Sequence, residues 1–163
     1  MTTQATVIRR LVIGVGNDFR GDDAAGLALV RRLRGSLPNG TVTREVTGDA
    51  AGIIEAWQGF DEVVIVDACS SGEEAGALFR FDAVGGAVPE QVLRECSTHA
   101  VGIANVIELA RTLGRLPPTL TVFAIEGTVF STGAPISHDV SLAVDSLAAQ
   151  LRQEWSRVQR KRT

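Results

Sequence analysis

Short apolar runs recur along the chain, and the segments between them are long enough to form helices. The run Glu62-Val-Val-Ile-Val-Asp67 is rich in β-branched residues and is typical of a strand that is buried on both faces of a sheet. A more alternating run at 76–81 predicts a shorter strand at the edge of the sheet, where it can run antiparallel. The expected strands cover residues 7–13, 41–47, 62–67, 76–81 and 119–125.

Apolar residues at helical spacing occupy the segments between these runs. The expected helices cover residues 22–34, a short segment after a cap at Asp49, residues 98–113, and a segment from a cap at Ser137 to Trp155. Strands that alternate with helices imply right-handed crossovers and parallel pairing. The sequence therefore predicts the α/β class: one three-layer α/β/α domain over residues 1–163, with a mainly parallel twisted sheet of about five strands.

A glycine-rich loop with two adjacent carboxylates follows the first expected strand. Gly14, Gly16 and Gly21 precede Asp22 and Asp23, which fall where the next helix is expected to begin. Acidic residues are common at helix starts because they accept hydrogen bonds from the first amides and favour the positive end of the dipole. Taken alone, the pair is explained by helix capping.

The expected topology gives the acidic pair a second interpretation. Asp67 ends the third expected strand, and in a 2-1-3 strand order the crevice at the carboxyl ends lies between the first and third strands. Asp22, Asp23 and Asp67 are therefore expected to meet at one edge of the sheet.

A histidine is the next candidate for this site. His99 follows Ser97 and Thr98 and is expected in the first turn of a helix, where the dipole disfavours its protonated form. A neutral imidazole with two carboxylates makes an incomplete set of metal ligands, although a polar residue in a first helical turn also explains His99. His138 occupies a similar position at the start of the last helix, with no comparable partners nearby in the sequence.

Composition excludes several classes of function. The formal net charge of −3 argues against nucleic acid as a partner, and the only lysine, Lys161, leaves no interior candidate for Schiff-base chemistry. No stretch has the length of a membrane span or the apolar core of a signal peptide. We expect a cytoplasmic monomer in which Cys69 and Cys96 stay reduced.

Two other motif interpretations have little support. The spacing Gly14-x-Gly16-x-x-x-x-Gly21 does not match the dinucleotide fingerprint, whose third glycine would fall at Phe19, and no lysine follows as in a nucleoside-triphosphate loop. Cys96-x-x-His99 could suggest a thiol nucleophile, but no third group that would orient the histidine is evident.

The motifs in their order resemble those of the maturation endopeptidases of nickel-iron hydrogenases. The resemblance extends from Leu11 to about Leu151 and is carried by Gly14-Val-Gly-Asn17, Asp22-Asp-Ala-Ala-Gly26, Ile65-Val-Asp67-Ala68 and Ser97-Thr-His99 with Gly102. Members of that family remove a short C-terminal extension from the hydrogenase large-subunit precursor after nickel has been inserted. They recognise the nickel of the substrate through two acidic residues and a histidine.

Carried over by position, the resemblance implies that Asp23, Asp67 and His99 contact nickel supplied by the precursor and form the catalytic site. Gly16 and Asn17 would shape the loop around them. The metal either polarises the scissile carbonyl or a water, or only positions the substrate.

One segment departs from the family pattern. Where many members have an acidic residue and two glycines, this chain has Thr47-Gly48-Asp49-Ala50, and Asp49 is also explained as a helix cap.

The sequence leaves two alternative functions open. One is a receiver-like phosphoacceptor domain, although no lysine follows the last strand, and the other is a nickel-binding chaperone without catalysis.

Overall fold

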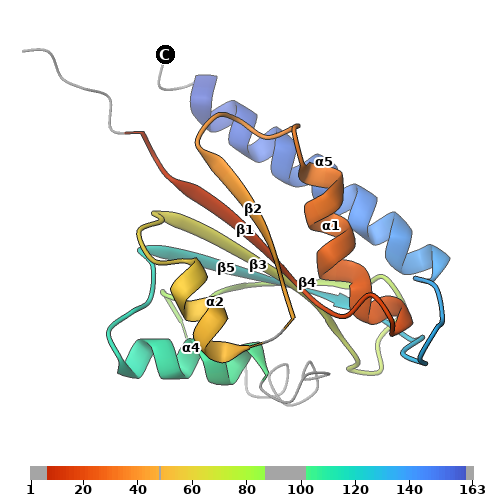
Figure 1. The fold of residues 1–163 in the computed structure, drawn as a ribbon. Coiled ribbons are helices and arrows are strands. Elements are labelled where there is room, and N and C mark those ends of the chain that lie inside the picture. Colours follow the sequence, from red (N-terminus) through yellow and green to blue (C-terminus); the bar gives the residue numbers. More distant parts are fainter. Residues whose placement is uncertain (1–6, 48, 87–101, 161–163) are drawn as a thin grey trace, which may run out of the picture.

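The computed structural model describes residues 7–47, 49–86 and 102–160 of the chain. Strands and helices alternate through most of this part (Figure 1). In chain order they are β1 (Arg10–Val15), the 3-10 helix η1 (Gly21–Ala24), α1 (Ala25–Leu33), β2 (Thr41–Val46), α2 (Ala50–Ala56), β3 (Glu62–Cys69), β4 (Leu78–Asp82), α4 (Ile103–Thr112), β5 (Thr119–Glu126) and α5 (His138–Arg160).

The strands form one five-stranded sheet in the order β2-β1-β3-β5-β4. The pairs β1–β2, β1–β3 and β3–β5 are parallel, and the edge strand β4 pairs antiparallel with β5. The expected fold class and the antiparallel edge strand are confirmed. Because β1 lies between β2 and β3, the winding direction changes between β1 and β3, as the 2-1-3 order requires.

Of the described helices, α2 and α4 cover one face of the sheet and α1 and α5 cover the other, so the domain has three layers (Figure 1). The side chains of β1 alternate between the two cores: Leu11 and Ile13 pack with α2 and α4, whereas Val12 packs with α1 and α5. Each core is therefore formed by every second side chain of the strands, which points to that face of the sheet, and by the apolar faces of two helices.

None of the described helices has both the length and the apolar composition needed to span a membrane.

The bounds of the first strand differ from the expectation. β1 covers Arg10–Val15, later than the expected 7–13, so Gly14 belongs to the strand and not to the loop. A Cβ on Gly14 would overlap with the backbone of Gly26 in α1. Gly14 therefore allows a helix to lie directly on the strand, a requirement that sequence periodicity does not reveal.

The expected helix over 22–34 is divided into η1 and α1, and Asp22 does not cap it. No side chain caps either helix, and Asp22 is fully buried. Its Oδ2 accepts hydrogen bonds from the amides of Thr128 and Val129, each at 2.9 Å, and its Oδ1 accepts one from the Ser137 amide at 2.7 Å. Asp22 thus ties the segment after β1 to the segment between β5 and α5.

Burial alone would raise the pKa of Asp22, but the amides of Ser137, Thr128 and Val129 together lower it below its ordinary value. The carboxylate is charged and is held by backbone dipoles. A Cβ on Gly127 would lie 2.7 Å from the Cβ of Asp22. The backbone can therefore pass this close to Asp22 because residue 127 has no side chain.

Glu126, at the end of β5, makes a second connection of this kind. Its carboxylate accepts hydrogen bonds from the Ser71 amide and hydroxyl, the Gly72 amide and the Cys69 thiol, at 2.7 to 3.2 Å. Burial raises its pKa, but these donors, Ser71 foremost, lower the pKa below the ordinary value. Glu126 thereby fixes the loop that leaves β3.

Two expected helix starts have different outcomes. Asp49 caps α2 as expected, since its carboxylate accepts hydrogen bonds from the amides of Ala51 and Gly52. The expected start of a helix at residue 98 is wrong for α4, which begins at Ile103 after an extended Gly102. The proposed caps Ser97 and Thr98 and the turn at Gly48 lie outside the described residues.

Replacing Asp22 by Ala should lower the free energy of unfolding by about 2 to 4 kcal/mol, because three inward-facing amides lose a charged acceptor. Asp22→Asn keeps one carbonyl oxygen and should cost less. Urea unfolding at neutral pH measures both. The control is Asp49→Ala, which removes an exposed cap and should cost about 1 kcal/mol. An equal loss in Asp22→Ala and Asp49→Ala would contradict the buried role of Asp22.

Glu126→Gln should reduce stability at neutral pH by about 1 to 3 kcal/mol, because an uncharged amide replaces an acceptor of several hydrogen bonds. The folded pKa of Glu126 lies below its unfolded value, so its charge stabilises the fold above about pH 4.3 and this contribution disappears as the pH falls further. The stability difference between wild type and Glu126→Gln should therefore shrink in acid. A difference that stays constant from pH 7 to pH 3.5 in urea titrations would show that the charge contributes nothing.

Candidate functional site

Two of the expected site carboxylates lie at the carboxyl edge of neighbouring strands. Asp23 is in η1, which follows the loop of residues 16–20 after β1 (the β1 loop), and is fully buried. Asp67 lies in β3, which continues to Cys69 and does not end at Asp67 as expected. The Asp67 side chain is buried and its Oδ1 accepts a hydrogen bond from the Ala68 amide at 2.8 Å.

A close contact between α1 and the sheet brings these two segments together. A Cβ on Gly26 would overlap with the carbonyl oxygens of both Val15 in β1 and Val66 in β3. The helix that follows Asp23 therefore rests on the backbone of the residue that precedes Asp67. The candidate site lies at the switch point of the sheet, the place where ligands of open α/β folds bind.

The loop residues expected to shape the site lie against Asp23. A Cβ on Gly16 would overlap with the Asp23 carbonyl oxygen, and the Asn17 amide donates a hydrogen bond to that oxygen at 3.2 Å. The Asp23 amide donates to the Arg20 carbonyl at 3.1 Å. The backbone amide and carbonyl of Asp23 are thus both bound to residues of the β1 loop.

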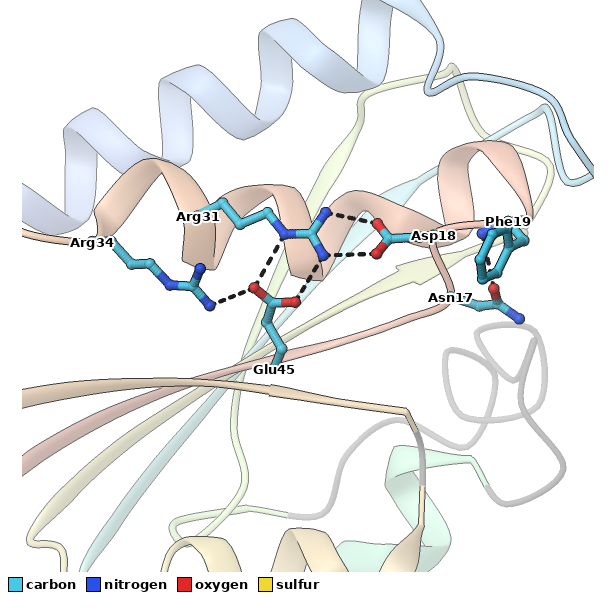
Figure 2. Close-up of polar contacts among 6 residues, drawn as sticks. All are labelled: Asn17, Asp18, Phe19, Arg31, Arg34 and Glu45. Atoms are coloured by element: carbon cyan, nitrogen blue, oxygen red, sulfur yellow. Dashed lines mark hydrogen bonds and ion pairs between the residues drawn. The ribbon is translucent and has the colours of Figure 1, made fainter.

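A network of charged side chains holds the outer part of this loop (Figure 2). The Arg31 guanidinium in α1 donates two hydrogen bonds of 2.7 Å to the Asp18 carboxylate and two more, at 3.1 and 2.8 Å, to Glu45 in β2. Arg34 also donates to Glu45, at 2.6 Å. The hydrogen bonds from Arg31 lower the pKa of Asp18 and of Glu45 below their ordinary values. Four charged residues thereby connect the β1 loop, α1 and β2.

No pattern in the sequence predicts this network. Asp18 and Arg31 are 13 residues apart and Arg31 and Glu45 are 14 apart, distances at which no helical or strand period pairs side chains. Only the packing of α1 beside β2 brings them together. An arginine fork with two carboxylates is a bidentate arrangement that fixes geometry as well as charge.

The two histidines have different outcomes. His99, and with it Cys96 and the thiol interpretation, lies outside the described residues. His138 is exposed at the first residue of α5. Within residues 7–47, 49–86 and 102–160, no group of three or more histidine, cysteine or acidic side chains is arranged to hold a metal ion.

The described carboxylates can serve two kinds of chemistry. Carboxylate oxygens are hard ligands that can contribute part of a metal coordination sphere, and a buried carboxylate can also accept a proton. Asp22 accepts hydrogen bonds from three backbone amides, and Glu126 accepts hydrogen bonds from the Ser71 amide and hydroxyl and from the Gly72 amide.

Comparison with known proteins identifies the family. Residues 46–154 match the family model HycI, described as hydrogenase maturation protease. The Hydrogenase 2 maturation protease of Escherichia coli (strain K12) is 31% identical over 130 residues, which is 72% of this chain and 73% of that protein. The hydrogenase expression/formation protein HupD of Bradyrhizobium diazoefficiens is 26% identical over 165 residues, covering 95% of this chain and 83% of HupD.

Solved structures show the same fold. The [NiFe] hydrogenase maturation protease HybD from Thermococcus kodakarensis aligns with a TM-score of 0.71 at 23% identity, over 91% of this chain and 99% of HybD. The solution structure of the endopeptidase HycI from Escherichia coli has a TM-score of 0.71 at 19% identity, over 90% of both chains. These matches decide against the receiver-like alternative and against a chaperone without catalysis. The protein is a peptidase, and the chain belongs to the hydrogenase maturation protease family.

Proposed function

We propose that this peptidase removes the C-terminal extension of a nickel-iron hydrogenase large-subunit precursor, and that it recognises the nickel already inserted in that precursor. Family membership supports a hydrogenase precursor as the substrate. The observation that carries the proposal is the placement of Asp23 and Asp67, two buried carboxylates from separate segments, at the switch point of the sheet.

In this proposal Asp23, Asp67 and His99 contribute ligands to the nickel of the precursor. Thiolates of the precursor would supply soft ligands, while the protease adds hard oxygen atoms and an imidazole nitrogen. Only a loaded precursor offers an ion that can accept these ligands. The metal thereby acts as the signal that maturation has reached the stage at which cleavage is correct.

The roles of the protein's own residues follow from their surroundings. Gly16 leaves room for the Asp23 carbonyl and the Asn17 amide binds it, so the backbone of Asp23 is ordered before substrate binds and little ordering is required at that moment. The bound nickel fixes the substrate against Asp23 and Asp67, with the scissile bond nearby. A fixed position of this kind converts a bimolecular encounter into a local one.

The first test is the length of the precursor. Purified protein should shorten a nickel-loaded large-subunit precursor at its C-terminus and leave the nickel-free precursor intact, because only the loaded form supplies the ion that the carboxylates bind. Intact mass measurements on both forms decide the matter. Equal cleavage of both forms would refute recognition through nickel.

A control separates this mechanism from that of a general metalloprotease. The protein is treated with a chelator, which is then removed before the loaded precursor is added. Cleavage should be unchanged, since the metal arrives with the substrate, and an unrelated unfolded protein should not be cut. Loss of activity after this treatment would indicate a metal that resides in the protease.

The second test concerns the proposed ligands. Asp23→Asn, Asp67→Asn and His99→Ala should each weaken the binding of nickel or cadmium and slow cleavage of the loaded precursor by about 100-fold or more. The asparagine variants keep an oxygen of the same shape, so they test the charge and not the packing. Calorimetry and cleavage rates are the measurements.

Matched controls exist for each residue type. Asp22→Asn changes the neighbouring carboxylate, which is engaged by three backbone amides, and His138→Ala removes the exposed histidine. Both should retain metal binding. Loss of binding in Asp22→Asn with Asp23→Asn unaffected would show that the other member of the acidic pair is the ligand.

A further inference from the structure

The β1 loop, which precedes Asp23, has an exposed aromatic side chain. Phe19 lies between β1 and η1, four residues before Asp23, and 75% of its surface is accessible. Among the large apolar side chains that are exposed in the described part of the chain, Phe19 is the most accessible and the only aromatic one. Folding gains little from this ring, because it remains in water.

The backbone of Phe19 is nevertheless firmly held. Its amide donates a hydrogen bond to Asn17 Oδ1 at 2.9 Å (Figure 2), and its carbonyl accepts one from the Gly133 amide at 2.7 Å. Two residues later, the Gly21 amide donates to the Ala134 carbonyl at 3.1 Å. The loop is therefore attached on one side to its own asparagine and on the other to the segment between β5 and α5.

The residue before Phe19 is held as well. Asp18 takes two hydrogen bonds from Arg31, whose guanidinium is itself fixed by Glu45 (Figure 2). These side chains are partly exposed, so the pairs add little to global stability. Their geometric effect is to hold the β1 loop against α1 and β2.

An exposed aromatic ring on a fixed backbone has the properties of a binding anchor. Aromatic residues dominate the energetics of interfaces, and they lose little conformational entropy on binding when their backbone is already ordered. Phe19 is also connected to the proposed cleavage site, because Asn17 accepts a hydrogen bond from the Phe19 amide and donates one to the Asp23 carbonyl.

We propose that Phe19 is a substrate-contacting residue whose ring binds an apolar side chain of the large-subunit precursor, beside the segment that carries the nickel. The Asp18–Arg31–Glu45 network positions the ring. This inference rests on the proposed function, since it takes the precursor as the partner. It adds a contact that is independent of metal coordination, so it contributes equally to nickel-loaded and nickel-free precursor.

Phe19→Ala should raise KM for the loaded precursor about tenfold or more while kcat changes little, because the contact is made in the ground state and the transition state alike. The affinity for nickel-free precursor, measured by direct binding, should fall by a similar factor. Phe19→Leu keeps apolar bulk and should retain most of the affinity. Unfolding midpoints in urea should match wild type, because the ring is exposed.

Two further variants sharpen the test. Leu113→Ala removes another exposed apolar side chain, 55% accessible and located after the C-terminal end of α4, and should leave KM unchanged. Arg31→Ala should raise KM by a smaller factor than Phe19→Ala. In the double variant the two effects should not add, because Arg31 acts through the placement of the ring.

The outcomes separate this inference from the proposed function. If wild type cleaves the loaded precursor and Phe19→Ala does so with unchanged KM and affinity, the inference is wrong and the function stands. If Phe19 instead covers a second copy of this chain, sedimentation will show a dimer that Phe19→Ala dissociates, which also overturns the inference. Wild type that neither binds nor cleaves either form of the precursor overturns both proposals.

Discussion

The close approach of α1 to the sheet is the constraint on which the site depends. Gly14 in β1 and Gly26 in α1 face each other without side chains, and Gly26 also contacts the backbone of Val66 in β3. A methyl group at either glycine would push the helix away from the strands. Because η1 leads directly into α1, the position of this helix also sets the position of Asp23 relative to Asp67.

Two of the buried carboxylates at the carboxyl edge of the sheet hold loops in place. Asp22 and Glu126 accept hydrogen bonds from the amides of loops that are distant in the sequence, and their lowered pKa values reflect those donors. They act as connections between loops at the carboxyl edge of the sheet. The functional proposal rests on Asp23, in η1 after β1, and on Asp67, near the carboxyl end of β3.

The same edge combines rigid support with an exposed surface. The Phe19 amide donates to Asn17 Oδ1 and the Phe19 carbonyl accepts from the Gly133 amide. These bonds and the ion pairs around Arg31 order the β1 loop, while the ring of Phe19 remains in solvent. An ordered loop that exposes an apolar ring is unfavourable for an isolated protein but reduces the entropic cost of binding a partner. A peptidase that acts on one folded precursor would benefit from such a surface.

The sequence by itself determined the fold class, the antiparallel edge strand and the family, because strand and helix periods, β-branched runs and motif order are local properties. It also indicated that Asp23 and Asp67 would share one edge of the sheet, since the carboxyl ends of parallel strands lie at the same edge. The tertiary structure alone decided what Asp22, Gly14 and Arg31 do. Asp22 looked like a helix cap, but its partners lie more than 100 residues away. Gly14 looked like a loop residue, but it is required by a helix that lies on the strand. No motif or period in the sequence marks Arg31, but it joins two carboxylates that only the packing of α1 and β2 brings together. Long-range contacts of this kind leave no period in the sequence, because they depend on where separate elements meet in space.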